Sequence, residues 1–480
     1  MVNKMKEHIQ QMFAGTFYQL LAAISGTFSA ISDGMQYGWS APLIPVLQAP
    51  DSPIKIDDAD IYWLETIYLL GGIAGLPVTI YFVDKIGRQK SLIIAASNSL
   101  TAWVIIVLAN RVEYLYVARF LTGLAMDVAF VSAPMYVAEI ADQKIRGFLA
   151  SLIFLMMLSG ILIIYVLAPY FDLWVSSVVG ALILLTQLAT FPFMPESPYY
   201  HLLKGKREEA RKALVFLRNK EDVETELKEI EAAIERQKSE KGRPQDLFLV
   251  PSNRKALIIM MVLNAAQQFS CMSVILMNLH LILESAGSIY MDSKIAAIIF
   301  SALMLLAAAV ASVFIDHYGR LVLLISSSIL TGISLFSLAA YFHFQYLDYD
   351  VITVSWIPIV SVMVYALVFK FGLGMVPIVL TAEIFPTKVK AMGMTIADAT
   401  YVIFGVVTIS LFQYLLKFYG MYVPFYLFSS LCFLTAIFGY FYIPETKGKT
   451  LEEIQMILKG IEPVVKTKDE SLEMENGTKL

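Results

Sequence analysis

The sequence predicts an all-α membrane protein in which twelve transmembrane helices form two six-helix halves with the same orientation. The first observation behind this prediction is composition. Of the 480 residues, 58% are hydrophobic and only 16% are charged, whereas a soluble protein of this length needs a more highly charged surface. The second observation is repetition, because short charged motifs in the first part of the chain return in the second part at offsets of 232 to 249 residues.

Apolar runs of about 20 residues recur along the chain, and each is long enough to cross roughly 30 Å of hydrocarbon as a helix. We place their approximate limits at 15–36, 61–83, 91–110, 113–138, 147–168, 174–193, 256–283, 294–315, 321–342, 354–382, 392–416 and 421–443.

The distribution of Lys and Arg predicts the orientation, because cytoplasmic loops retain these residues in excess. If both termini are cytoplasmic, four of the 36 basic residues fall in outer loops and two fall within spans, which leaves 30 on the cytoplasmic side. The four are Lys55, Arg111, Lys294 and Lys417, and the two are Arg119 and Lys370. We therefore expect a multi-pass protein of the cell membrane with cytoplasmic N- and C-termini.

The composition changes at residues 201–255, where Glu, Lys and Arg alternate with Leu, Ile and Phe at helical spacing. We interpret this stretch as a cytoplasmic linker of short amphipathic helices, and a purely solvated linker is the alternative. It separates an N-terminal six-helix half (1–200) from a C-terminal six-helix half (256–445), and a polar cytoplasmic tail (446–480) follows.

The partner that these features indicate is the lipid bilayer. The net charge of −4 does not indicate a partner, because the polarity that matters runs across the membrane, and we expect no nucleic acid and no obligate protein partner. No cluster of His, Cys or acidic residues has the spacing of a metal site or a nucleophile. We therefore expect no enzymatic activity, no cofactor and no metal.

An acidic and a basic residue stand seven positions apart at the end of one apolar run in each half. They are Glu139 and Arg146 in the first half, and Glu383 and Lys390 in the second. Seven residues make two turns if the helix continues, or one turn and a corner if a new element begins at Gly147. In either case both groups lie at a membrane edge.

Two further motifs also repeat, a short basic turn and the end of the last span of each half. They are Asp84-x-x-Gly87-Arg88 with Asp316-x-x-Gly319-Arg320, and Pro195-Glu196-Ser197-Pro198 with Pro444-Glu445-Thr446-Lys447. Together the three pairs indicate a duplicated six-helix unit. Two parallel halves around a site near the membrane midplane are typical of transporters.

In combination, these motifs resemble those of the sugar porters of the major facilitator superfamily, such as the arthropod facilitative trehalose and hexose transporters. Further matches are Arg119-x-x-x-Gly123, Pro134-x-Tyr136-x-x-Glu139-Ile140, Gln267-Gln268 and Glu383-Ile384-Phe385-Pro386. The resemblance implies the major facilitator fold and uniport of a small-molecule sugar by alternating access. A proton-coupled sugar symporter and a non-transporting sugar sensor are the alternatives.

The resemblance also implies a role for the repeated charges. In the family, they pair across helices while the cytoplasmic side is closed and separate when it opens; anchoring of helix ends is the alternative. The gating candidates are Asp84, Arg88, Glu139, Arg146, Glu196, Asp316, Arg320, Glu383, Lys390 and Glu445. Lys390 stands where the family usually has Arg, so bidentate pairing is lost there.

Coupling to protons is a separate question. Proton-driven members of the family place an acid in the first helix opposite the fourth-helix Arg, which is Arg119 here, and the aligned residue is Gln36, which cannot ionise. The resemblance therefore favours uniport. Asp33 and Asp127 are intramembrane carboxylates and stay candidates for coupling, with ion pairing or snorkelling toward a cavity as the alternative.

Gln267 and Gln268 are the strongest candidates for a sugar site, because two adjacent amides in an apolar span need polar partners, although packing between helices is an alternative. The resemblance adds Gln36, Phe154, Ser273, Pro377, Ile378 and Tyr401. At Phe154 and Ser273 the amides typical of the family are missing. We therefore predict poor glucose transport and a shifted cargo, either a disaccharide such as trehalose or a less polar glycoside.

Overall fold

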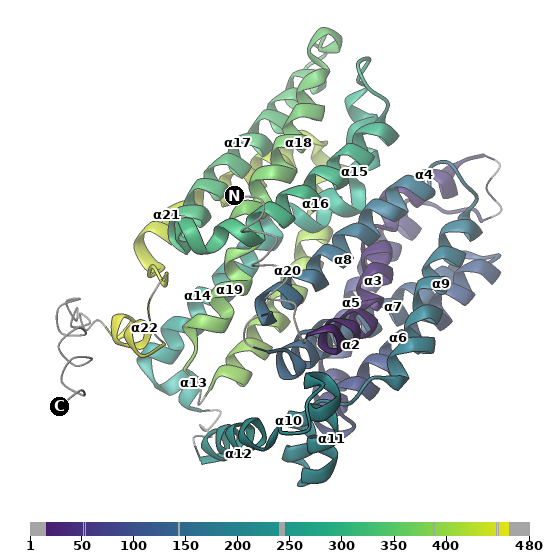
Figure 1. Ribbon diagram of the computed structural model, residues 1–480. Coiled ribbons are helices and arrows are strands. Elements are labelled where there is room, and N and C mark those ends of the chain that lie inside the picture. The colour runs from purple at the N-terminus through teal and green to yellow at the C-terminus, as the bar shows by residue number, and fades with distance from the viewer. Residues whose placement is uncertain are drawn as a thin grey trace, which may run out of the picture.

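The computed structural model describes residues 16–50, 52, 54–142, 145–239, 245–386, 389–447, 449 and 451–459. Every regular element within these residues is a helix, and Figure 1 shows the helices of the two halves packed side by side. Eleven helical segments of this described part are long and apolar enough to cross a membrane. The all-α membrane class that the composition predicts is confirmed.

The first predicted span takes a different form from the others. It consists of three consecutive short helices, α2 (Phe17–Thr27), α3 (Ser29–Tyr37) and α4 (Ser40–Gln48), and it continues well beyond the predicted end at 36. Polar side chains of this stretch, Ser32, Asp33, Gln36 and Ser40, are all buried inside the bundle. None of the three helices alone reaches the length of a span, so this stretch is not among the eleven segments, and it stands where the sequence predicts the first of twelve crossings.

The remaining helices of the first half follow the predicted spans closely. They are α5 (Asp58–Lys85), α6 (Arg88–Leu108), α7 (Val112–Ile140), α8 (Arg146–Leu167) and α9 (Leu173–Thr190), with a 3-10 turn over Phe191–Phe193. An N-terminal capping box starts α5, since the side chains of Asp57 and Asp60 each accept a hydrogen bond from the other's backbone N–H. The seven positions from Glu139 to Arg146 turn a corner, because α7 ends and α8 begins between them.

The second half repeats this order of helices. Its members are α14 (Pro251–Phe269), α15 (Met272–Ala286), α16 (Ser293–Tyr318), α17 (Arg320–Tyr346), α18 (Trp356–Phe371), α19 (Val376–Ile384), α20 (Lys390–Tyr419) and α21 (Tyr422–Tyr442), with a 3-10 turn over Ile352–Val354. Two predicted spans are broken, one at Cys271 with a φ of 74° and the other after Phe371. Both breaks free backbone groups, which need partners within the protein because lipid offers none.

Short helices lie at one end of the bundle, which we call the linker side; the opposite end is the far side (Figure 1). They are α10 (Pro198–Leu203), α11 (Arg207–Arg218), α12 (Glu224–Ser239), α13 (Asp246–Leu249) and α22 (Leu451–Leu458). Helix α11 is amphipathic and buries Ala210, Leu214 and Leu217. Arg218 fastens it to the bundle by donating a hydrogen bond of 2.8 Å to the carbonyl oxygen of Ile140.

The two halves are in contact on the far side. Helices α4, α5 and α8 of the first half pack against α15, α20 and α16 of the second half, respectively. Tyr62, near the start of α5, lies 3.3 Å from the hydroxyl of Ser410, and Tyr165, near the end of α8, donates a 2.7 Å hydrogen bond to the carbonyl of Leu276. Both of these helix ends lie on the far side.

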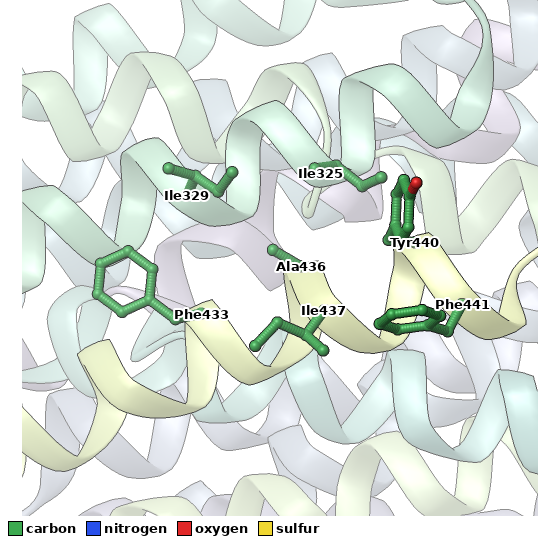
Figure 2. A pocket seen from close by; sticks show the side chains of 7 residues that line it. All are labelled: Ile325, Ile329, Phe433, Ala436, Ile437, Tyr440 and Phe441. Carbon is green, nitrogen blue, oxygen red and sulfur yellow. The ribbon is translucent and has the colours of Figure 1, made fainter.

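A groove of about 420 Å³ lies on the outer surface between α17 and α21 (Figure 2). Its lining is aliphatic and aromatic, with Ile325, Ile329 and Phe433 among its residues. Tyr440 and Phe441 at one end are 70% and 71% exposed, as expected of side chains that face lipid. The groove has almost no polar groups to bind a polar solute, so the candidate site lies elsewhere.

Candidate functional site

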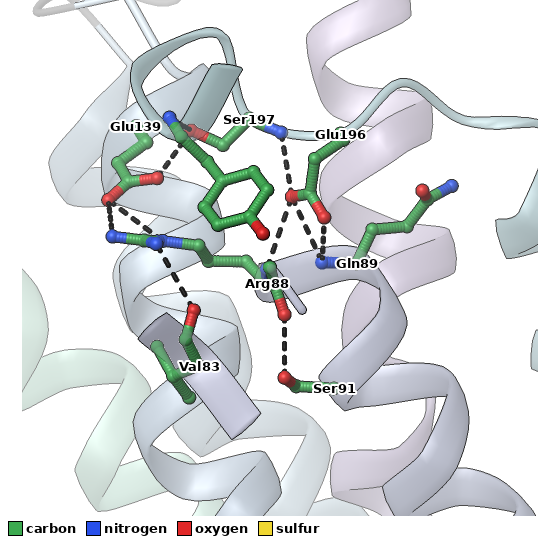
Figure 3. A network of polar contacts seen from close by, with 9 residues as sticks. Val83, Arg88, Gln89, Ser91, Glu139, Glu196 and Ser197 are labelled. Atoms are coloured by element: carbon green, nitrogen blue, oxygen red, sulfur yellow. Dashed lines mark hydrogen bonds and ion pairs between the residues drawn. The ribbon is translucent and has the colours of Figure 1, made fainter. Parts of the chain in front are cut away.

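A polar network on the linker side of the first half contains three of the predicted gating residues (Figure 3). The Nε and Nη2 atoms of Arg88 donate to Glu139 Oε1 at 3.1 and 2.9 Å. The hydroxyl of Ser197 donates to the other oxygen of Glu139, and Arg88 Nη1 donates to the carbonyl of Val83 at 3.3 Å. The pair joins α6 to α7 within one half, and it is well buried, with side-chain exposures of 4% for Arg88 and 13% for Glu139.

Glu196, the third of these residues, binds the start of α6. Its carboxylate accepts hydrogen bonds from the backbone N–H groups of Arg88 at 3.2 Å and Gln89 at 3.1 Å. The first N–H groups of a helix have no partner within the helix and carry partial positive charge, so an anion stabilises this end. Gly87 precedes the helix with a φ of 101°, and a Cβ there would lie 2.3 Å from Glu196 Oε2.

The second half contains the same network. Arg320 Nη2 donates to Glu383 Oε1 at 3.0 Å, and the hydroxyl of Thr446 donates to Glu383 Oε2 at 2.6 Å. Arg320 and Glu383 are more exposed than their counterparts, with side-chain exposures of 11% and 25%. Gly319, with a φ of 88°, stands where Gly87 stands in the first half.

Glu445 binds the start of α17 as Glu196 binds that of α6. Its oxygens accept from the backbone N–H groups of Arg320 at 3.1 Å and Leu321 at 3.0 Å. Burial would raise the pKa of Glu445, but these N–H groups and those of Lys447 and Thr446 bind the carboxylate and hold the pKa below its usual value. Glu445 is therefore an anion at neutral pH.

The remaining gating candidates lie outside these two pairs. Asp84 is exposed at the end of α5, and Arg146 is exposed at the start of α8, where it donates to the carbonyl of Ala141 at 3.3 Å. Lys390 is partly exposed at the start of α20, close enough to Glu383 for an electrostatic interaction. The side chain of Asp316 lies outside the described residues.

A second polar cluster, which we call the central cluster, lies where the halves meet. The hydroxyl of Tyr37 on α3 is 2.8 Å from that of Ser273 on α15, which donates to Gln268 Oε1 at 2.6 Å. Tyr401 of α20 interacts with Tyr37 and Gln268. Three predicted sugar-site residues therefore converge in one cluster, and sequence reasoning assigned no such role to Tyr37.

Gln267 has a different set of contacts. Its Nε2 donates to the carbonyl of Leu373 at 2.8 Å and lies 3.4 Å from that of Gly374. Both carbonyls belong to the break between α18 and α19, so the amide supplies partners that the broken helix lacks. Pro377 is buried in the first turn of α19, and its neighbour Ile378 is 40% exposed.

The other predicted site residues lie apart from the central cluster. Phe154 on α8 is partly exposed and packs edge-on against Phe130, with ring centroids 6.1 Å apart. Gln36 on α3 contacts Arg119, which is fully buried and donates to the Gln36 carbonyl at 2.6 Å and to the Leu64 carbonyl at 3.1 Å.

The two carboxylates that are candidates for proton coupling also lie outside the central cluster. Asp33 is buried within α3, and Asp127 on α7 accepts a hydrogen bond from the hydroxyl of Thr79. Two further intramembrane acids escaped sequence reasoning, Glu65 on α5 and Asp398 on α20. Their signal was available, because each is a carboxylate inside a predicted apolar span.

The family model described as "Sugar (and other) transporter" matches residues 10–458. The chain belongs to this sugar transporter family. Among curated relatives, the facilitated trehalose transporter Tret1 of Drosophila virilis is 31% identical over 451 residues, which make up 92% of this chain and 49% of that protein. Tret1 of Polypedilum vanderplanki is 29% identical over 451 residues, 92% of this chain and 88% of that protein.

Solved structures share the fold of this sugar transporter family member. The proton:xylose symporter XylE bound to 6-bromo-6-deoxy-D-glucose matches with a TM-score of 0.71 at 23% identity, over 92% of this chain and 98% of that chain. A partially occluded, inward-open form of XylE from E. coli matches with a TM-score of 0.73 at 21% identity, over 91% of this chain and all of that chain. These matches confirm the major facilitator fold. The chain spans about half the length of the first curated relatives it matches.

Proposed function

We propose that this protein is a facilitative sugar transporter that works by alternating access. The observation that carries the proposal is the central cluster, in which Tyr37 from one half meets Gln268, Ser273 and Tyr401 from the other. A hydroxyl-rich solute can replace these mutual hydrogen bonds one for one when the halves separate. Binding at a junction also lets one solute favour closure of either side, as a transport cycle requires.

The proposed cargo is a disaccharide such as trehalose, with a hexose as the second candidate. Partly exposed apolar groups, Phe154 and Ile378, stand at positions where the family's polar or aromatic sugar contacts are expected, which favours a larger or less polar sugar over glucose. The relatives named as facilitated trehalose transporters support this choice.

Uniport is the proposed mode of transport, and proton symport is the alternative. Arg119 donates to the backbone carbonyl of Gln36, and the Gln36 amide oxygen lies 3.4 Å from the same guanidinium. A neutral amide therefore lies opposite this arginine where proton-driven relatives have an acid.

For orientation, we propose that the linker side is cytoplasmic, that both termini lie there, and that the membrane is the cell membrane. We also propose functional units at 1–200, 201–255, 256–445 and 446–480. Helices α10 to α13 fall between the two six-helix halves and carry many of the basic residues, which supports both proposals.

The test is uptake of labelled trehalose, glucose and a β-glucoside by purified protein in liposomes. Gln268→Ala removes one member of the central cluster, and we expect it to weaken trehalose binding by about tenfold, in line with the loss of one buried hydrogen bond. Ser337→Ala is a matched control, because Ser337 is partly exposed on α17, away from the central cluster, and its hydroxyl bonds to its own helix.

Three results would count against parts of the proposal. Robust glucose uptake at millimolar affinity would show that the missing amides matter less than proposed. Unchanged trehalose uptake in Gln268→Ala would remove the central cluster as the site. Stimulation of uptake by an inward proton gradient without a membrane potential would instead favour symport.

A further inference from the structure

Glu65 is a buried acid at the far-side contact between the halves, and none of the roles above uses it. It lies in the second turn of α5 and has no solvent exposure. Its Oε2 accepts a 3.1 Å hydrogen bond from the Gln413 amide on α20, so the contact crosses from one half to the other. Gln413 Nε2 also lies 3.4 Å from Asn278 Oδ1 on α15.

The polar groups around Glu65 are incompletely satisfied. Glu65 Oε1 and Asn278 Nδ2 have no hydrogen-bond partner within the described structure, although both residues are buried. Asn278 also has a non-helical backbone conformation inside α15, with a φ of −122°. A carboxylate anion can accept about four hydrogen bonds, so the ionised form of Glu65 is poorly stabilised in this closed arrangement.

Three elements face Glu65 besides its own helix, and they contribute one charge. Helix α20 contributes Gln413 and α15 contributes Asn278, which are neutral amides. Helix α7 contributes Arg119, which is near enough for an electrostatic interaction but directs its hydrogen bonds to Leu64, Gln36 and Ser40. The guanidinium therefore forms no direct ion pair with Glu65 among the contacts of the described residues.

Separation of the halves on the far side would stabilise the ionised form of Glu65. It breaks the bond to Gln413 and admits water, which readily solvates a carboxylate anion. Closure removes that water, so the closed form favours the neutral acid and the open form favours the anion.

We propose that Glu65 is a proton-binding latch, which holds a proton while the far side is closed and releases it to the far side when the halves separate there. The inference rests on the alternating access proposed above. Because the proton enters and leaves by the same side, it is not carried across the membrane. Uptake from the far side therefore depends on the pH of that side, while sugar transport stays uncoupled from the proton gradient.

The sign of the effect follows from linkage. Protons bind the closed form more tightly, so acid on the far side favours closure and alkali favours opening. One pH unit shifts the ratio of protonated to ionised carboxyl tenfold, so the ratio of open to closed protein changes by up to about tenfold per unit near the midpoint.

The first measurement needs no sugar transport, so it is independent of the proposed function. Spin labels on Asn110→Cys and Leu347→Cys, two exposed far-side positions in opposite halves, report the distance between the halves by electron resonance. The native Cys271 and Cys432 are buried. We expect the long-distance population to grow between about pH 5.5 and about pH 8.5, and to stay small at both values in Glu65→Gln.

His280→Asn is the matched control. His280 is a buried titratable residue on the same helix as Asn278, it packs edge-on against Tyr165 of the other half, and both its ring nitrogens have no partner in the described structure. We expect His280→Asn to keep the pH dependence of the parent. If the parent shows no pH dependence, or if Glu65→Gln keeps it, the latch is not Glu65, and a loss in His280→Asn would assign the pH dependence to His280.

The second measurement is sugar flux in liposomes with the pH varied on one side at a time. We expect far-side acid to slow uptake from that side, and Glu65→Gln to lose this dependence. Accumulation of sugar against its gradient, driven by a proton gradient, would overturn the uncoupled latch. Absence of sugar flux at every pH would refute the proposed function and leave the distance measurement standing.

Discussion

The linker-side networks of the two halves are built from the same parts but differ in burial. In each network, an arginine at the start of one helix pairs with a glutamate at the end of another. A neighbouring hydroxyl donates a hydrogen bond to that glutamate, and a second glutamate binds the start of the arginine's helix. The first-half pair, Arg88 and Glu139, has side-chain exposures of 4% and 13%, whereas Arg320 and Glu383 have 11% and 25%. The first-half arginine also lies 5.3 Å from the ring of Tyr200 on α10.

This difference shows what each network contributes. A charge pair sealed from water is strongly disrupted when one partner is lost, because the other remains buried and unpaired, while a pair open to water loses less. Both pairs lie within a half, so neither joins the halves directly in this conformation. We infer that the first-half network mainly holds α6, α7 and α10 as one body, and that the second is the easier one to rearrange.

The largest expected effect is that of breaking the first-half pair. Arg88→Leu leaves Glu139 without its counter-charge, and we expect a loss of stability of about 3–5 kcal/mol, compared with about 1–2 kcal/mol for Arg320→Leu. Thermal unfolding of the purified proteins in detergent measures both. Equal losses in the two variants would show that the difference in burial has no energetic consequence.

Turnover gives a second measure of the same pairs. If the pairs bias the conformational equilibrium and not the sugar site, Arg88→Leu and Glu383→Gln lower the maximal uptake rate in liposomes and leave the sugar affinity nearly unchanged. Uptake rates equal to the parent's in both variants would leave only the alternative, that these charges anchor helix ends.

The next effect concerns the glycines that precede α6 and α17. A Cβ on Gly87 would lie 2.3 Å from Glu196 Oε2, and one on Gly319 would lie 2.8 Å from Glu445 Oε2. The positive φ alone costs about 1–2 kcal/mol for alanine. We expect Gly87→Ala to lose more stability than Gly319→Ala, because its carboxylate must also move off the helix start, and thermal unfolding compares the two. A larger loss in Gly319→Ala would contradict this ordering.

A smaller effect comes from the hydroxyls that bind the two glutamates. Ser197→Ala and Thr446→Val each remove one hydrogen bond to a carboxylate, and we expect a loss of about 1–2 kcal/mol in each. In a double-mutant cycle, Ser197→Ala combined with Glu139→Gln measures the coupling, and Thr446→Val with Glu383→Gln measures it in the second half. Coupling absent from both cycles would mean that the hydroxyls contribute packing alone.

The residues of these networks stand out in the sequence, because charged side chains in a membrane protein are few and their motifs repeat. Gly87, Arg88, Glu139 and Glu196 were placed at one membrane edge by motif alone. What the motifs could not specify was the partner of each charge. Arg88 pairs with Glu139 and Gly87 lies against Glu196, and such contacts between helices depend on how the helices pack and not on spacing along the chain.

The candidate sugar site was predicted less completely. Gln268, Ser273 and Tyr401 converge as a site requires, but Gln267, which looked equivalent to its neighbour, lies one position around the helix and binds the break between α18 and α19. The break itself depends on backbone geometry that apolar periodicity does not reveal. Glu65 carries the same signal as Asp33 and Asp127, a carboxylate within a predicted apolar span, but its place at the contact between the halves depends on how the helices pack.

The smallest expected effect is that of Lys390→Arg, which makes the second half resemble the first at the position of Arg146. In this conformation Arg146 is exposed and binds a carbonyl at the end of α7, and Lys390 is partly exposed near Glu383. An exposed basic residue contributes little to stability, so we expect a change below about 0.5 kcal/mol in the free energy of unfolding.

We expect the effect of Lys390→Arg in the opposite conformation, in which the linker side is closed. An arginine binds a carboxylate with two hydrogen bonds, whereas a lysine provides a point charge. If the linker side closes through such pairs, Lys390→Arg favours that closed state, and the spin-label distance on the far side lengthens at constant pH. A shorter distance, or a loss of stability as large as that of Arg88→Leu, would show that Lys390 already belongs to the network of the state described here.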